Sequence, residues 1–207
     1  MQPTTAPTIT RAATPNDAPL VCELYKRAPD YFERLGAEVP TLSEVSRELE
    51  VALADPCRRV ELILSAHEGL LDSSQNLANQ NPANKQNANY VSALTKPVQL
   101  PRVVGYLDYK MNFPERGDTT INLLLVGKPW QRSGYGARAM EDLEARLSGR
   151  VKRLLASIYG QNPRAKRFWE ALGYSFAIDA KPVLDWYAKY LEPQPSTSLS
   201  LMRLPAC

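Results

Sequence analysis

Gln131-Arg132-Ser133-Gly134-Tyr135-Gly136-Ala137 is the stretch of sequence that decides the fold of this chain. It follows a strand-like apolar run over 119–126 and leads into a helical pattern over 135–147. Glycines let a backbone approach a ligand closely, and the free amides of a first helical turn attract anions. Arg132 adds a positive charge. The stretch therefore predicts a strand, a loop and a helix that cradle a phosphate, although a lone Gly-x-Gly pair also occurs in ordinary turns.

Length and composition indicate an ordinary globular protein. The 207 residues are 44% hydrophobic and 23% charged, enough for one domain with a full core. No apolar run approaches the roughly 20 residues that span a bilayer, and the N-terminus lacks the pattern of a signal peptide. We therefore expect no membrane partner and a cytoplasmic location. The widely spaced Cys22, Cys57 and Cys207 predict reduced thiols, and with the single His67 they predict no metal site.

Positive charge is concentrated around the loop. From Lys128 to Arg167 there are ten basic and three acidic residues, a net of +7, whereas the whole chain carries +3. A basic region of this kind suits an anionic ligand. We expect no nucleic acid, because the sequence lacks both the interleaved aromatic residues of a single-strand platform and a recognition-helix motif. Arg132 and Lys166 are the expected ligand partners, and the residues expected on a solvated face are Arg146, Arg150, Lys152 and Arg153.

Strand and helix patterns alternate outward from the loop. Their order predicts a mixed α/β protein with a central, twisted, mixed sheet of about six to seven strands and helices on both faces. Leu20 and Leu42 are expected among the buried residues of their helices. The expected strands are 8–13, 60–66, 102–110, 119–126, 153–159, 174–178 and 198–204, and the expected helices are 15–27, 30–35, 42–54, 135–147, 163–172 and 184–191.

Two segments of the chain predict little regular structure. Residues 1–7 are rich in Thr and Pro and are expected to form a frayed tail. Residues at about 72–99 form a low-complexity stretch rich in Asn and Gln, which is unable to bury a core of its own. We interpret it as a loop insertion in a hairpin, with a substrate lid as the alternative.

A second motif stands about thirty residues after the loop. The segment Asn162-Pro163-Arg164-Ala165-Lys166-Arg167-Phe168-Trp169 begins with a helix cap, and Gly173-Tyr174 ends the helix before a strand. With the Gln-x-x-Gly-x-Gly loop, this pattern resembles the GCN5-related N-acetyltransferase (GNAT) superfamily, which shows Gln/Arg-x-x-Gly-x-Gly/Ala followed by Asn-x-x-Ala-x-x-Phe-Tyr. The resemblance implies a GNAT-like fold with one N-acetyltransferase domain over 8–204. It also implies direct transfer of an acetyl group from acetyl-CoA to a primary amine of a small molecule or peptide.

The resemblance also implies which residues bind acetyl-CoA. The loop would hold the diphosphate, and the end of the strand before it would pair with the pantetheine arm between two parted strands. From the residues alone, Asn162 fits a helix cap equally well, and Phe168 fits a core residue better than a ligand contact. The cofactor-binding residues expected in full are Leu124, Leu125, Val126, Gln131, Arg132, Ser133, Gly134, Tyr135, Gly136, Ala137, Asn162, Lys166 and Phe168.

Two departures from the family pattern affect the expected chemistry. Many relatives carry a glutamate base at the position of Thr120 and a tyrosine acid at the position of Trp169. A threonine and an indole are unable to replace them. Asn122 shares the face of Thr120 and can position a water or the amine. Tyr159 and Tyr174 can each replace the missing acid, and Tyr159 is preferred. We therefore expect Asn122 and Tyr159 as catalytic residues.

The sequence leaves the acceptor open. Segments 29–40, 102–110 and 184–191 are expected to shape its pocket, with acidic and aromatic residues over 30–33 and with Tyr106 and Tyr109 lining the same site. The alternative to an active enzyme is a non-catalytic acyl-CoA-binding or regulatory module, which the changes at Thr120 and Trp169 keep open. The family often forms homodimers, and the sequence does not decide whether this protein forms one.

Overall fold

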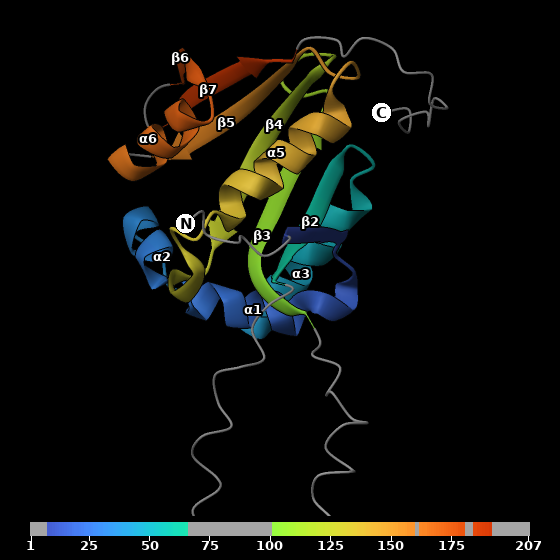
Figure 1. The fold of residues 1–207 in the computed structure, drawn as a ribbon. Helices are drawn as coiled ribbons and strands as arrows, with labels where there is room; N and C mark the ends of the chain where they lie inside the picture. Colours follow the sequence, from blue (N-terminus) through green and yellow to red (C-terminus); the bar gives the residue numbers. More distant parts are fainter. Residues whose placement is uncertain (1–7, 66–100, 160–161, 181–183, 192–207) are drawn as a thin grey trace, which may run out of the picture.

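The structure is a computed structural model that describes residues 8–65, 101–159, 162–180 and 184–191. These residues form a seven-stranded sheet in the order β1-β2-β3-β4-β5-β7-β6 (Figure 1). β4 and β5 pair in parallel, and the other neighbouring strands pair antiparallel. The strands are β1 (Thr8–Ala12), β2 (Arg58–Ser65), β3 (Arg102–Met111), β4 (Asp118–Val126), β5 (Arg153–Tyr159), β6 (Ser175–Ala180) and β7 (Leu184–Tyr190).

Helices cover both faces of the sheet. α1 and α3 pack against each other and against β3 and β2, while α5 packs against β1, β3 and β4 (Figure 1). None of the described helices is both long and apolar enough to cross a membrane. The helices are α1 (Ala18–Lys26), α2 (Pro29–Leu35), α3 (Leu42–Ala54), α5 (Tyr135–Leu147) and α6 (Pro163–Ala171), with short 3-10 turns at Pro15–Asp17 and Lys128–Trp130.

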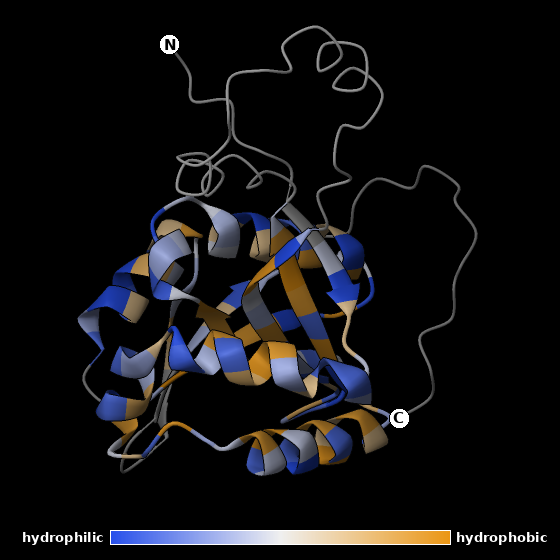
Figure 2. Ribbon diagram, turned by 90° about the horizontal axis from the view of Figure 1, so that it is seen from below, coloured by the Kyte–Doolittle hydropathy of each residue, from blue (hydrophilic) through white to orange (hydrophobic). Residues whose placement is uncertain are grey.

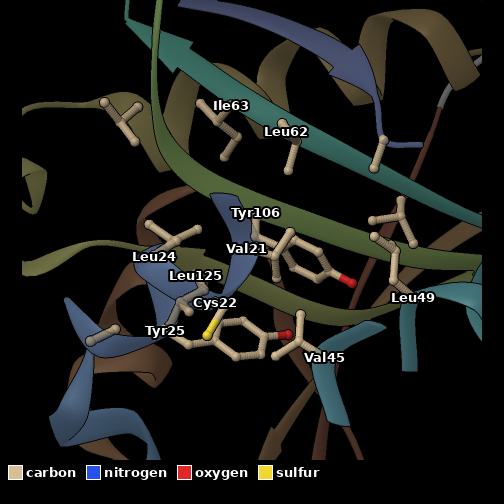
Figure 3. Close-up of a cluster of buried hydrophobic side chains, with 14 of the residues drawn as sticks. Val21, Cys22, Leu24, Tyr25, Val45, Leu49, Leu62, Ile63, Tyr106 and Leu125 are labelled. Carbon is tan, nitrogen blue, oxygen red and sulfur yellow. The ribbon is translucent and has the colours of Figure 1, made fainter. Parts of the chain in front are cut away.

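The alternation of side chains along β3 serves both layers of the core. Tyr106 points to α1, where its ring lies 5.9 Å from the ring of Tyr25, and Leu49 of α3 packs in the same cluster (Figure 3). Leu107 belongs to the second cluster, with Leu143 of α5. Figure 2 shows hydrophobic residues concentrated on the central strands, and hydrophilic residues on the outer turns of the helices. Both ends of the loop before α5 are therefore anchored in packed elements.

The ends of the expected helices follow local chemistry. Thr41 caps α3, because its Oγ1 accepts from the Glu44 amide at 3.4 Å and the Glu44 carboxylate accepts from the Thr41 amide at 2.7 Å. α2 ends at Gly36, whose φ of 64° lies in the left-handed region. A capping box therefore starts α3, and a left-handed glycine ends α2.

The expected mixed sheet with helices on both faces is confirmed, and one element is wrong. The segment 184–191, expected as a helix, is mostly strand β7, which pairs with both β5 and β6. Burial of Leu20 and Leu42 is also wrong, because their side chains are 44% and 48% exposed. The expected tail at 1–7, insertion at 72–99 and strand at 198–204 lie outside the described residues.

Two of the arginines expected on a solvated face also form ion pairs with buried acids, and of these Arg146 is exposed as expected. Arg146 of α5 donates to both carboxylate oxygens of Glu61 at 2.8 Å, and Arg153 of β5 donates to both oxygens of Asp118 at 2.6 and 3.0 Å. These bidentate contacts join distant parts of the chain. Arg146 and Arg153 therefore leave less free positive charge for a ligand than the sequence count indicates.

The expectation that all the cysteines are reduced is also corrected. Cys22 is a buried free thiol. Cys57 is disulfide-bonded.

Candidate active site

β4 and β5 separate in the middle of the sheet. Their parallel pairing runs from Asp118 opposite Arg153 to Ile121 opposite Ala156 and goes no further. Beyond that point β4 continues beside β3 as far as Val126, and β5 continues beside β7. Among the described residues, no strand pairs with the edge of β4 that faces β5 after Ile121. A wedge therefore opens between the two strands, with backbone groups of β4 along one side.

The loop that follows β4 presents unpaired amides next to this wedge. Gly134 has a φ of 82° and Arg132 a φ of 62°, so the loop holds two residues in the left-handed region. Within the described part of the chain, the amides of residues 132–137 donate to no carbonyl oxygen, and the first bond of α5 joins Arg138 to Gly134. Gln131 fixes the loop, because its Nε2 donates to the Val126 carbonyl at 3.0 Å. This geometry suits an anion at the start of α5.

The loop glycine, the strand end and α6 meet at the mouth of the wedge. A methyl group placed on Gly136 would lie 3.5 Å from Cζ of Phe168 and 3.6 Å from Cγ2 of Val126. Asn162 caps α6 by accepting from the Ala165 amide at 3.1 Å, so the helix-cap interpretation is confirmed. Lys166 lies half-buried on the same helix.

Three of the expected cofactor residues have side chains that pack in the core. The Tyr135 side chain is buried, and its hydroxyl bonds the Ser65 hydroxyl at 2.9 Å. Leu125 is 5% exposed, and Leu124 is half-buried against the core. The backbone groups of Tyr135 and Leu124 can therefore meet a ligand, whereas those of Leu125 face Tyr106 of β3.

A pocket of about 470 Å³ lies between β3–β4 and the layer formed by α1, α2 and α3. Buried aromatic residues make its floor, and exposed residues of α3 make its rim. Burial raises the pKa of the Tyr25 and Tyr106 hydroxyls, so both stay protonated at neutral pH. The lining residues are Tyr25, Tyr31, Phe32, Leu35, Pro40, Arg47, Glu48, Val51, Arg58, Tyr106, Asp108, Asn122 and Leu123.

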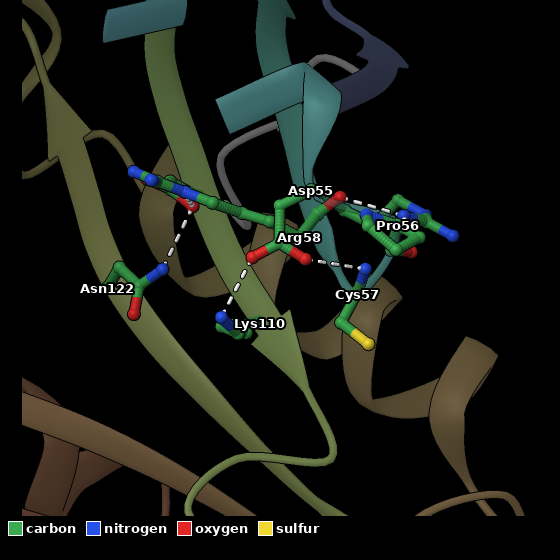
Figure 4. Close-up of polar contacts among 8 residues, drawn as sticks. Asp55, Pro56, Cys57, Arg58, Lys110 and Asn122 are labelled. Carbon is green, nitrogen blue, oxygen red and sulfur yellow. Dashed lines mark hydrogen bonds and ion pairs between the residues drawn. The ribbon is translucent and has the colours of Figure 1, made fainter. Parts of the chain in front are cut away.

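The acid in this pocket is not among the residues expected from the sequence. The side chain of Asp108, in the middle of β3, is 4% exposed and forms a two-point ion pair with Arg58 of β2. Asn122 donates its Nδ2 to Asp108 Oδ1 at 3.1 Å (Figure 4). An aspartate between apolar and aromatic residues of the strand was the signal in the sequence, because buried carboxylates are rare unless they are paired.

The two expected catalytic residues lie in different surroundings. Asn122 lines the pocket where β4 leaves β5. Tyr159 is 44% exposed at the end of β5 and does not line the pocket. Thr120 is buried and donates to the Phe113 carbonyl at 2.7 Å, and Trp169 is buried against Phe168. Core packing therefore occupies the two positions where the family pattern places its base and acid.

Two of the residues expected to shape the acceptor pocket do not line this one. Tyr109 points to the opposite face of the sheet, because it follows Asp108 by one residue, and its hydroxyl donates to Glu61 at 2.9 Å. Asp30 lies outside the lining, and its carboxylate is 3.7 Å from the Lys128 ammonium. Tyr31, Phe32 and Tyr106 line the pocket as expected.

Solved structures share this architecture. An acetyltransferase from Thermus thermophilus is 32% identical, with a TM-score of 0.71, over 90% of this chain and 99% of that one. An acetyltransferase from Salmonella typhimurium that modifies the N-terminal serine of ribosomal protein L7/L12 is 12% identical, with a TM-score of 0.64, over 91% and 97%. Spermidine N-acetyltransferase from Vibrio cholerae, solved with CoA and spermine, is 10% identical, with a TM-score of 0.59, over 88% and 95%. At the last two identities the likeness shows the fold alone.

Sequence comparison assigns the family. No curated protein matches the chain significantly. The model of the acetyltransferase (GNAT) family matches residues 60–174, which contain the parted strands, the glycine loop and α6. With that match and the Thermus thermophilus relative, the chain belongs to the GNAT acetyltransferase family.

Proposed function

We propose that this protein transfers an acetyl group from acetyl-CoA directly to a primary amine of a small molecule or peptide. The observation that carries the proposal is the separation of β4 from β5 after Ile121, next to a loop whose amides are unpaired within the described residues. That arrangement offers a diphosphate site and an open strand edge in one groove. Asn122, the first residue of β4 after its pairing with β5 ends, also lines the pocket in which the acceptor would bind.

The residues present fit acetyl-CoA. The amides of 132–137 and the start of α5 would hold the diphosphate, and the side chain of Arg132 would add charge. The backbone groups of Leu124 and the Val126 amide, on the edge of β4 that faces away from β3, would pair with the amides of the pantetheine arm, as a peptide pairs with a strand edge. Gly136 leaves room for the arm between Val126 and Phe168. When bound, the cosubstrate supplies an acetyl group activated as a thioester.

The transfer itself needs alignment more than it needs a strong acid or base. The amine nitrogen forms a bond to the acetyl carbon while the carbon–sulfur bond breaks, the amine gives up one proton, and the departing thiolate gains one. Holding the two reactants in line can supply several kcal/mol of barrier lowering, on the order of 7–11 kcal/mol at best. Asn122 lines the pocket in which the amine would lie, where β4 separates from β5. Tyr159, exposed at the end of β5, is the proposed proton donor to the thiolate.

The floor of the pocket also indicates the body of the acceptor. Tyr25, Phe32 and Tyr106 are 5–6% exposed, and the rings of Tyr25 and Phe32 lie 5.1 Å apart. Aromatic rings gain free energy by excluding water from apolar surface. We infer that the acceptor carries its primary amine on a compact apolar or aromatic body.

A thiol-release assay with acetyl-CoA tests the proposal. Purified protein is incubated with a panel of primary amines, from alkylamines to aromatic ethylamines and N-terminal peptides, and free thiol is measured against reactions without amine. The proposal expects turnover of at least one class, with higher kcat/KM for apolar than for highly charged amines. Tight binding of acetyl-CoA in calorimetry without turnover on any amine would favour the non-catalytic module instead.

A further inference from the structure

β4 carries an extra residue at the point where it leaves β5. Across from β3, Asp108 faces Leu123 and Tyr109 faces Ile121, so Asn122 has no partner in the register. Asn122 and Leu123 consecutively line the same pocket, whereas successive residues of a regular strand point to opposite faces. A β-bulge re-aims side chains in this way and is common beside active sites. The bulge therefore brings the Asn122 side chain to the acceptor side of the wedge.

The Asn122 amide is held in one orientation. Its Nδ2 donates to Asp108 Oδ1 at 3.1 Å, and in Figure 4 its oxygen lies on the side away from that bond. A carboxylate only accepts hydrogen bonds, so Asp108 can pair with the NH₂ end of the amide and not with its oxygen. Among the described residues, no group donates to the Asn122 oxygen. The aspartate thereby selects which end of the amide is left for a ligand.

Asp108 is itself rigid. Arg58 donates Nε to Oδ1 at 2.9 Å and to Oδ2 at 3.1 Å, and its Nη2 makes a second, short contact with Oδ2. The aspartate side chain is 4% exposed, whereas Asn122 is exposed. A planar guanidinium that grips both oxygens fixes the plane of the carboxylate. A series of hydrogen bonds thus connects the ion pair of Arg58 and Asp108 to the exposed amide of Asn122, whose oxygen is left open.

We propose that Asp108 is a positioning residue for acyl transfer: it turns Asn122 so that the amide oxygen accepts a hydrogen bond from the incoming amine. The inference rests on the proposed function. An amine that attacks a carbonyl aims its lone pair at the carbon, so its N–H groups must point elsewhere. A fixed acceptor beside the wedge orients those N–H groups, and a freely turning amide would present its NH₂ half of the time.

Four variants test this role: Asp108→Asn, Asn122→Ala, the double variant and Asp118→Asn. Asp118 is the matched control, because it is also nearly buried, also bound at two points by an arginine, and lies at the far end of β4 outside the pocket. Each protein is assayed for kcat and KM with the best amine, for the acetyl-CoA Kd by calorimetry, and for Tm.

D108N and N122A should each lower kcat/KM for the amine by about 10- to 100-fold, the size expected when a reactant is misplaced by about 1 Å. The acetyl-CoA Kd should stay unchanged. Because Asp108 acts through Asn122, the double variant should be no slower than N122A alone. D118N should lose Tm and keep its kcat/KM.

Two results would overturn the inference while leaving the proposed function intact: D108N with unchanged kcat/KM, or a double variant in which the two losses multiply. If D108N fails to fold, N122A still tests the inference, because Asn122 is exposed and its replacement should leave the fold intact. An unchanged kcat/KM of N122A would show that the Asn122 oxygen does not orient the amine. Wild-type protein that binds no acetyl-CoA contradicts the proposed function instead.

Discussion

Gly136→Ala should stabilise the fold and weaken cofactor binding at the same time. The new methyl group would lie 3.5 Å from Phe168 and 3.6 Å from Val126, which is ordinary van der Waals contact, so the packing accepts it. Gly136 belongs to the first turn of α5, and no positive φ is found there. The same methyl would fill the gap that the pantetheine arm needs between the strand end and α6.

The two effects have different sizes. Alanine in a helix is favoured over glycine by roughly 0.5–1 kcal/mol. In a domain of this length that gain corresponds to a rise in Tm of about 1–4 °C. A loss of contact or a displacement of the arm should weaken acetyl-CoA binding at least tenfold, which equals about 1.4 kcal/mol.

Differential scanning calorimetry and titration calorimetry measure both effects on one preparation. Gly134→Ala is the contrasting variant, because its φ of 82° costs an alanine about 1–2 kcal/mol, so its Tm should fall. A G136A protein that binds acetyl-CoA as tightly as the wild type would refute the placement of the arm. A G136A protein with a lower Tm would refute the packing argument.

Two further predictions concern the scaffold. Gly105→Ala should lower the free energy of unfolding by about 1–3 kcal/mol or more. The new Cβ would lie 2.8 Å from the Leu125 carbonyl oxygen and 2.9 Å from Ile63, in the centre of the sheet. An unchanged urea midpoint would contradict this prediction. The hydrogen bonds from Arg11 lower the pKa of Asp17 from 3.8 to about 2, so the pair stabilises the fold above about pH 4 and loses that contribution as the pH falls towards 2. Asp17→Asn should therefore be less stable than the wild type at pH 7, and the difference should shrink between pH 4 and 2; a difference that is independent of pH would show that the ion pair is not its cause.

Local signals explain why most of the fold could be predicted. The capping box at Thr41, the glycine stop at Gly36 and the capped start of α6 each depend on residues within one turn. Segment 184–191 lacks such a signal. It is short, its apolar and aromatic residues fit either period, and its pairing with β5 and β6 decides in favour of a strand.

The site was only half predictable for the same reason. The glycine loop and Asn162 are contiguous motifs, and the structure brings them together at one end of the wedge. Asp108 depends on Arg58, fifty positions earlier in the chain, and on a bulge at Asn122 that no pattern in the sequence announces. Such contacts between distant residues exist only once the register of β3 with its two neighbours is known.

A crystal structure of the protein with acetyl-CoA tests the central claim most directly. We expect the diphosphate within hydrogen-bonding distance of the amides of residues 132–137, and the pantetheine arm along the free edge of β4 between that strand and β5. A diphosphate bound elsewhere on the surface, or an arm that leaves the wedge between β4 and β5 empty, would contradict it.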